Sequence, residues 1–250
     1  MTKHNCDNDI CRLLNPCLDE LLPYQEVIGR VAQIEESLYA NVRKMKKMKK
    51  MERMEIAERL HISHPLDLWS WANHHMVYQL PNKEFIHGLT EKIKEIGADT
   101  ILEIGAGRGI VSKRISEILN KKIVLTDSYE WWEHWEYAEK IEHPDVIKRN
   151  YVQAIEEFKP DLIIASWIPY DKCWTRDFRK YPFVKGYIII GEGRGGATGS
   201  EEDWNTDWNM QYWDNVTKYG ICKTDHGFSM KDPILQVLHT DVTYFERPKT

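Results

Sequence analysis

The amino-acid sequence predicts an α/β protein in which a helical extension precedes a mostly parallel sheet of seven strands with an antiparallel C-terminal edge. Three observations predict this class. Short apolar runs alternate with helical stretches from residue 99 onward. A glycine-rich turn, GAGRG, follows the first of these runs and leads into a helical stretch. Before residue 99 the apolar residues recur at helical spacing.

The extension contains one long amphipathic stretch. From Glu26 to about Leu60 apolar residues recur every three or four positions, and no Pro or Gly occurs between Arg30 and His64. Residues 41–60 carry eight Lys or Arg and three Glu, although the whole chain has a net charge of −5. We interpret the stretch as a helix that packs its apolar stripe on the main domain. The alternative is that residues 43–59 bind an anionic partner such as nucleic acid.

A boundary between two units is expected near residue 80. Pro65 cannot continue the long helix. A further helix is predicted from Lys83 to Ile96, where Gly97 can end it. We therefore divide the chain into a helical cap, residues 1–79, and an α/β domain, residues 80–250.

The strands of the sheet are predicted from apolar runs of strand length. These runs lie at residues 100–104, 122–126, 145–149, 161–166 and 187–191. Because helical stretches separate them, they predict parallel strands covered on both faces. Residues 221–228 and 234–247 are interpreted as an antiparallel hairpin at the sheet edge. The four-residue spacing of Trp204, Trp208 and Tyr212 predicts one face of a helix.

Composition excludes several classes of protein. At 42% hydrophobic and 29% charged residues, the chain is neither disordered nor collagen-like, and its apolar runs are too short to span a membrane. No secretion signal is evident, so a cytoplasmic location is expected. We interpret the five cysteines as reduced thiols. Cys6, Cys11 and Cys17 lack the paired spacing of zinc sites, which predicts no metal; a site completed by His4 is the alternative.

The strongest functional signal is LEIGAGRGIV at residues 102–111. Three glycines let the backbone approach a ligand closely. A dinucleotide fingerprint would place its third glycine at position 110, which is Ile110, so the pattern argues against a nicotinamide or flavin cofactor. The pattern resembles the acidic-x-G-x-G-x-G motif of class I S-adenosylmethionine (SAM)-dependent methyltransferases.

This resemblance implies a Rossmann-like fold with SAM over the carboxyl ends of the strands. It assigns Glu103 to the α-amino group of SAM, Asp127 to the ribose diol and Asn150 to the adenine amino group. Asp127 and Asn150 could instead cap the helices that follow them. The expected cofactor-binding residues are Glu103, Gly105, Ala106, Gly107, Gly109, Asp127, Ser128, Asn150, Tyr151, Ser166 and Trp167.

The fourth strand leads into SWIPY at residues 166–170, which is similar to the N/D/S-P-P-Y/F loop of amino-methyltransferases. That loop binds an NH₂ group and stacks an aromatic ring on a planar substrate. Here one more residue separates the polar position from the proline, so Ser166 or the Trp167 carbonyl would have to bind the acceptor. The expected substrate-binding residues are Trp167, Pro169, Tyr170 and Trp131.

A wider resemblance extends over about residues 78–213. YQLPNKEFI, LEIGAGRGI, SWIPY and YIIIGEGRGGATGSEEDW together resemble a poorly characterised methyltransferase-like group with an S-W-P-P-Y-type loop. This resemblance supports the fold and the cofactor and supplies no substrate.

Acidic and aromatic side chains near the strand ends are candidates for catalysis. If the acceptor is an amine or hydroxyl, a base would help the transfer. Glu192 is the preferred base, Asp171 and His226 are alternatives, and Tyr170 is included among the catalytic candidates. A helix cap is the other interpretation of Asp171, and pairing with Arg194 that of Glu192.

The sequence therefore predicts a SAM-dependent methyltransferase acting on an amine- or hydroxyl-bearing small molecule. The first alternative is a base N-methyltransferase of nucleic acids or nucleotides that uses the basic residues 43–59. The second is a cofactor-binding interaction module without activity. The acceptor and the oligomeric state are not encoded in these patterns.

Overall fold

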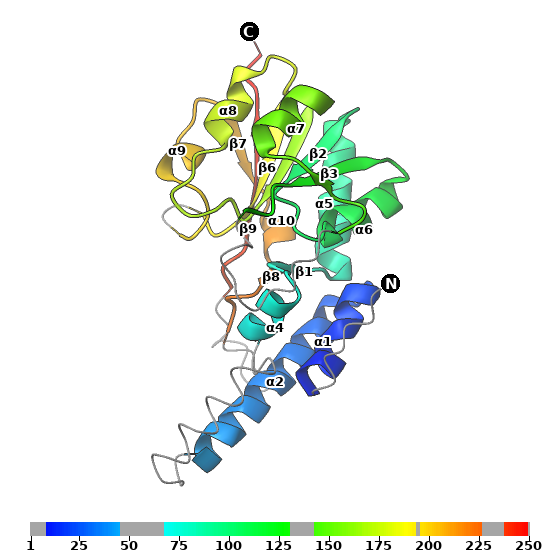
Figure 1. The fold of residues 1–250 in the computed structure, drawn as a ribbon, viewed down its shortest axis with the longest axis vertical. Helices are drawn as coiled ribbons and strands as arrows, with labels where there is room; N and C mark the ends of the chain where they lie inside the picture. The colour runs from blue at the N-terminus through cyan, green and yellow to red at the C-terminus, as the bar shows by residue number, and fades with distance from the viewer. Residues whose placement is uncertain (1–8, 46–67, 131–142, 194–195, 227–237, 250) are drawn as a thin grey trace.

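The computed structural model describes residues 9–45, 68–130, 143–193, 196–226 and 238–249 (Figure 1). Its elements form two parts: a group of N-terminal helices and a twisted sheet with helices on both faces. No helix in the described ranges is long and apolar enough to cross a bilayer.

The N-terminal helices pack on one another through an apolar core of their own. They are α1 (Asp9–Asp19), α2 (Tyr24–Met45) and α4 (Leu68–His74). Leu14, Val31 and Trp71 lie in this core and are fully buried. Figure 1 shows α1 lying beside α2, and α2 running away from the sheet. The predicted helix over residues 26–60 thus exists to Met45. Residues 46–60 fall outside the described part, so most of the basic segment 43–59 is not placed.

The main sheet has seven strands in the order β4-β3-β2-β5-β6-β9-β7. Their bounds are β2 (Ile101–Ile104), β3 (Ile123–Asp127), β4 (Ile147–Lys148), β5 (Leu162–Ser166), β6 (Gly186–Gly191), β7 (Asn209–Tyr212) and β9 (Asp241–Glu246). The pairs from β4 to β6 are parallel, and β9 runs antiparallel to both β6 and β7. The predicted α/β class with a mostly parallel sheet and an antiparallel C-terminal part is confirmed.

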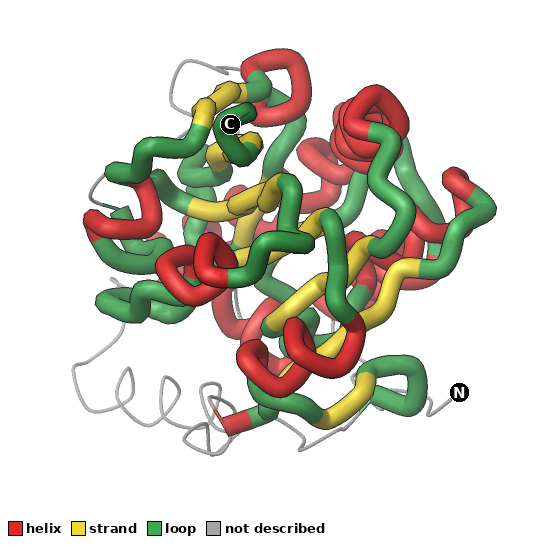
Figure 2. Tube along the Cα trace, turned by 90° about the horizontal axis from the view of Figure 1, so that it is seen from above, coloured by secondary structure: helices red, strands yellow, loops and turns green. Residues whose placement is uncertain are grey.

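Helices cover both faces of this sheet, as Figure 2 shows from above. They are α5 (Lys83–Ile96), α6 (Ile110–Leu119), α7 (Tyr151–Phe158), α8 (Thr175–Lys180), α9 (Glu201–Trp204) and α10 (Asp214–Thr217). Along β5 alternate residues enter opposite cores: Leu162 and Ile164 pack with α5 and α6, whereas Ile163 and Ala165 pack with α7 and α8. This two-residue alternation explains why the strand is apolar throughout.

Predicted helix α5 is confirmed at both ends. The Asn82 side chain accepts a hydrogen bond from the Phe85 N–H, which caps the first turn. Gly97 ends the helix in the left-handed conformation, with φ of 68°.

Two predictions near the C-terminus are wrong. Residues 221–222 form β8 (Ile221–Cys222), which pairs with β1 (Gln79–Leu80) in a separate two-stranded sheet instead of with β9. The Asp225 carboxylate accepts the Cys222 N–H, and this turn ends β8 before a hairpin can form. The four-residue aromatic spacing is also not helical, because residues 209–212 form the edge strand β7, paired with β9.

Cys11 is disulfide-bonded, so the expectation that every cysteine is reduced is wrong at this position. Of the other members of the alternative metal site, His4 and Cys6 lie outside the described residues, and Cys17 is a buried free thiol.

Candidate functional site

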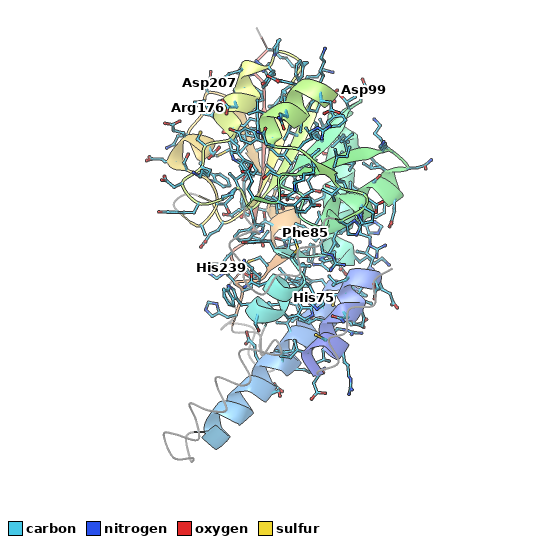
Figure 3. All side chains as sticks on the ribbon, in the orientation of Figure 1. His75, Phe85, Asp99, Arg176, Asp207 and His239 are labelled. Carbon is cyan, nitrogen blue, oxygen red and sulfur yellow. The ribbon has the colours of Figure 1, made fainter. Side chains whose placement is uncertain are left out.

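A cavity of about 680 Å³ lies at the carboxyl ends of β2, β3 and β5. In Figure 3 Asp99, just before β2, lies at the far end of the sheet from His75. The carboxyl ends of the parallel strands therefore face the N-terminal helices. The strand order reverses between β2 and β5, and open α/β sheets bind ligands at this switch point. The size suits a cofactor-sized ligand.

The glycine turn after β2 forms the floor of the cavity. Gly105, Gly107 and Gly109 have φ of 63°, 55° and 66°, a region that side chains with a Cβ disfavour. A Cβ on Gly105 would come within 3.2 Å of the Trp174 ring, and one on Gly109 within 2.5 Å of Leu125. Gly109 thus fits α6 against β3 and does not line the cavity, whereas Gly105 and Gly107 do.

Asp127, at the end of β3, holds this turn in place. One carboxylate oxygen accepts the Gly107 N–H at 2.7 Å and the other accepts the Tyr129 N–H at 2.7 Å. Burial raises the pKa of Asp127, and these two hydrogen bonds oppose the rise. Each oxygen has a second lone pair, so the carboxylate can still accept from a ligand in the cavity.

Glu103 is a buried carboxylic acid in the wall of the same cavity. The residue is 2% exposed, and its Oε2 atom has no hydrogen-bond partner among the residues that the structure describes. Burial raises the pKa of Glu103 to about 8, with a smaller opposing contribution from the Ser112 hydroxyl. A buried carboxyl oxygen without a hydrogen-bond partner destabilises the folded protein unless a ligand donates a hydrogen bond to it. A cationic group in the cavity would do so.

The segment after β5 forms the opposite wall. Trp167 has φ of 55°, and its backbone N–H donates to the Ile190 carbonyl at 2.7 Å. A non-glycine residue in this conformation is strained, and such strain is common at functional sites. The Ser166 hydroxyl is buried, and no group in the described part of the chain forms a hydrogen bond with it. Pro169 and the exposed Tyr170 complete this side of the cavity.

A third wall comes from the small β1–β8 sheet, which our sequence reasoning missed. Gln79 is the first residue of β1 and Tyr78 precedes it, whereas Lys223 directly follows β8, and all three line the cavity. The Lys223 ammonium lies 3.4 Å from the centre of the Tyr78 ring and donates to Asn73 Oδ1 at 2.8 Å. Burial lowers the pKa of Lys223 to about 8. The sequence signal was the YQLP segment, which entered the wider resemblance but was assigned no site residue.

Most of the expected site residues line this one cavity. They are Glu103, Gly105, Ala106, Gly107, Asp127, Ser128, Asn150, Tyr151, Ser166, Trp167, Pro169 and Tyr170. Asn150 also caps α7 by accepting the Gln153 N–H, as the alternative interpretation expected. Trp131 lies outside the described residues.

None of the three expected bases is among the described residues that line this cavity. Glu192 accepts the Ala197 N–H at 2.9 Å and so holds the loop after β6. Asp171 is exposed, with φ of 61°, and its N–H donates to the Gly199 carbonyl. His226 is exposed and contacts the Thr224 carbonyl and the His239 ring.

Three groups that can bind a metal lie together beside this wall. Ligand atoms of Cys222, Asp225 and His239 come within 4.8 Å of one another. Asp225 Oδ1 accepts hydrogen bonds from the Cys222 thiol and from both the backbone N–H and the ring of His239. These hydrogen bonds connect the turn after β8 to His239, and they explain why the three groups lie together.

Comparisons with known proteins add the following. No protein-family model matches the chain, and no curated protein matches it in sequence. Human N-acetylserotonin methyltransferase in complex with SAM is 14% identical, with 96% of this chain and 67% of that chain covered and a TM-score of 0.37. PigF with SAH is 17% identical, with coverages of 66% and 62% and a TM-score of 0.34.

The methyltransferase domain of bacterial CtHen1-CN is 7% identical, with coverages of 66% and 98% and a TM-score of 0.37. The chain therefore spans about two thirds of the length of the first two proteins, at 67% and 62%. The function has to be argued from the geometry of the cavity and not from these likenesses.

Proposed function

We propose that the protein is a SAM-dependent methyltransferase that acts on a small molecule. The observation that carries this proposal is the buried Oε2 atom of Glu103, which has no hydrogen-bond partner among the described residues and lies beside a glycine turn whose bend is fixed by Asp127. SAM has an α-ammonium group that needs an anionic acceptor and a ribose diol that needs hydrogen-bond acceptors. It has no pyrophosphate, and the fingerprint for one is interrupted at Ile110.

The residues of the cavity fit SAM as follows. Glu103 would accept from the α-ammonium, and Asp127 would accept from the ribose diol with its remaining lone pairs. Asn150 and Tyr151 would lie at the adenine end. Arg108, a half-buried cation of the lining, would bind the carboxylate. When bound, SAM supplies a methyl group on a positively charged sulfur, from which a nucleophile can take it.

The work of the chain is then to align the acceptor and to exclude water. The cap, residues 1–79, contributes the Met76–Gln79 segment to the lining, so we propose that it encloses the acceptor. Trp167 and Tyr78, with ring centres 6.0 Å apart, would flank a planar acceptor. The names of the similar structures, methyltransferases with SAM or SAH, agree with this proposal.

Calorimetric titration with SAM and with its demethylated product SAH tests the cofactor, and NAD is the control. The expected result is binding of SAM and SAH and none of NAD. Incubation of the protein with methyl-labelled SAM and a small-molecule extract then tests turnover. Binding without transfer to any acceptor would favour a non-catalytic module, and absence of SAM binding would overturn the proposal.

A further inference from the structure

The orientation of one buried amide determines what the β1–β8 wall can recognise. Gln79 is 4% exposed and lines the cavity. Its Oε1 atom accepts from the indole Nε1–H of Trp167 at 3.3 Å and from the Thr240 hydroxyl at 3.1 Å. Because an indole N–H can only donate, the atom that faces it must be the amide oxygen. The Gln79 amide is therefore held in one orientation.

This orientation leaves the amide nitrogen of Gln79 without a hydrogen-bond partner in the described structure, although the atom is buried. Its two N–H bonds are donors. An unsatisfied buried amide costs free energy unless a ligand accepts from it. The Gln79 amide nitrogen can therefore bind a ligand atom that accepts a hydrogen bond, and it cannot bind one that only donates.

Lys223 adds a positive charge to the same wall. Its side chain is 7% exposed, and its ammonium lies over the Tyr78 ring as well as donating to Asn73. An ammonium group carries three N–H donors and no acceptor. The Gln79 amide nitrogen and the Lys223 ammonium are thus both donors in the lining of the cavity, and one of them is a cation. The Tyr78 and Trp167 rings add flat apolar surface beside them.

We infer that the methyl acceptor is a flat ring bearing an anionic oxygen, a phenolate or an aromatic carboxylate, that Gln79 and Lys223 bind. This inference rests on the proposed function and names its substrate class. An amine acceptor would present its own N–H donors to Gln79 Nε2 and to the Lys223 ammonium, and neither group can accept a hydrogen bond. The oxygen version of the proposed reaction is therefore favoured over the nitrogen version.

The inference also explains why the expected bases need not line the cavity. An anionic oxygen has no proton to lose. Transfer forms the O–CH₃ bond and breaks the S–CH₃ bond, and the electron pair of the broken bond stays on sulfur. The sulfonium and the oxyanion become a neutral thioether and a methyl ether or ester, so charge and atoms balance. Lys223 and Gln79 bind and orient the oxygen in this scheme.

The test measures the binding of simple probes to the SAH-loaded full chain by ligand-observed NMR. The probes are benzoate, 4-nitrophenolate and benzylamine. We expect at least one of the two anions to bind and benzylamine not to bind. Benzoate alone would define the acceptor as a carboxylate, and 4-nitrophenolate alone as a phenolate. Binding of benzylamine in preference to both anions, or of no probe at all, would overturn the inference.

Variants identify the groups responsible. Lys223→Met keeps most of the side-chain length and removes the charge, and Gln79→Glu replaces the amide donor by a carboxylate. Each should weaken anion binding about tenfold or more, because a charged hydrogen bond is lost or a like charge is introduced. The matched control is Lys218→Met, since Lys218 is exposed and also lies near a tyrosine ring, 4.9 Å from the centre of Tyr219, but outside the cavity. Anion affinity equal to that of the unmodified protein in both cavity variants would contradict the assignment.

SAH binding separates this inference from the proposed function. It is measured by calorimetry in every variant before the probes are added. If the unmodified protein fails to bind SAH, the proposed function fails. If it binds SAH but prefers benzylamine or ignores all three probes, the substrate class fails and the cofactor assignment stands.

Discussion

The carboxylate of Asp127 accepts the backbone N–H of Gly107, 20 positions earlier in the chain, at 2.7 Å. This bond ties the end of β3 to the bend that follows β2, so the two strand ends that line the cavity are held as one unit. The residue proposed to bind the ribose diol of SAM and the glycine turn beside Glu103 therefore depend on one another for their positions.

Asp127→Asn tests this dependence. An amide can accept one of the two backbone N–H groups through its oxygen, but its NH₂ then faces the other N–H, so one donor is left unsatisfied. We expect SAH to bind more weakly and the folded protein to be less stable. The binding free energy and the free energy of unfolding should each fall in magnitude by about 1–3 kcal/mol. Calorimetry and urea denaturation measure the two quantities. Asp99→Asn, the same change at an exposed residue at the other end of the sheet, is the control, and no change in Asp127→Asn would place the ribose elsewhere.

The pKa of Glu103 makes stability depend on pH. Its pKa is raised from 4.5 to about 8 in the folded protein, which therefore binds a proton that the unfolded chain releases between these values. The free energy of unfolding should fall as pH rises through this window. Glu103→Gln, which stays neutral, should show a flatter profile in urea denaturation. A variant profile parallel to that of the unmodified protein would mean that Glu103 is ionised in the folded state.

The same group links cofactor binding to proton release. If the α-ammonium of SAM pairs with Glu103, binding favours the carboxylate and expels the proton. At about pH 6.5 we expect release of close to one proton per SAM in the unmodified protein and close to none in Glu103→Gln. Titration calorimetry in buffers with different ionisation enthalpies counts the protons. Equal release from both proteins would contradict the pairing.

Gly109 and Gly97 provide a matched pair for the glycine turn. Both have left-handed φ, of 66° and 68°, but a Cβ on Gly97 meets nothing within 4 Å, whereas one on Gly109 would lie 2.5 Å from Leu125 Cδ1. Gly97→Ala should cost about 1 kcal/mol from backbone strain, and Gly109→Ala should cost more because it adds a collision. Urea denaturation compares them. Equal losses would show that the packing of α6 on β3 relaxes around the added methyl group.

Lys223 should give the opposite pH dependence to Glu103. Its pKa is lowered from 10.5 to about 8, so between these values the unfolded chain binds a proton that the folded protein does not. The free energy of unfolding should rise as pH increases through this window. Lys223→Met should lose that rise in denaturation series from about pH 7 to 10, and Lys218→Met should keep it. A persisting rise in Lys223→Met would assign it to another group.

The part of the site that could be predicted from the sequence consists of residues in or directly after the recognisable parallel strands. Glu103, the glycines and Asp127 each follow a strand whose apolar run is visible, so their meeting at one sheet edge follows from parallel strand order. The limits of β4 were less predictable, because Ile147 and Lys148 at the sheet edge are exposed and bury no apolar face.

The β1–β8 wall could not be predicted, because contact between segments so distant leaves no periodic pattern. Gln79 bonds to Thr240 across 161 positions, and Lys223 to Asn73 across 150. A strand of two residues such as β8 also has too few positions for alternation to be recognised. Glu192 was assigned to the cavity from its place at a strand end, but a turn bends its carboxylate back to the Ala197 N–H.

The two-stranded sheet of β1 and β8 is separate from the seven-stranded one, yet it provides the groups that would select the acceptor. On the proposed assignment, substitutions in it therefore alter substrate preference and leave the glycine turn, proposed to bind SAM, intact. A family built on this plan could diversify its chemistry through two short segments that lie far apart in the chain. Residues aligned with Gln79 and Lys223 are where such divergence among homologues should be sought first.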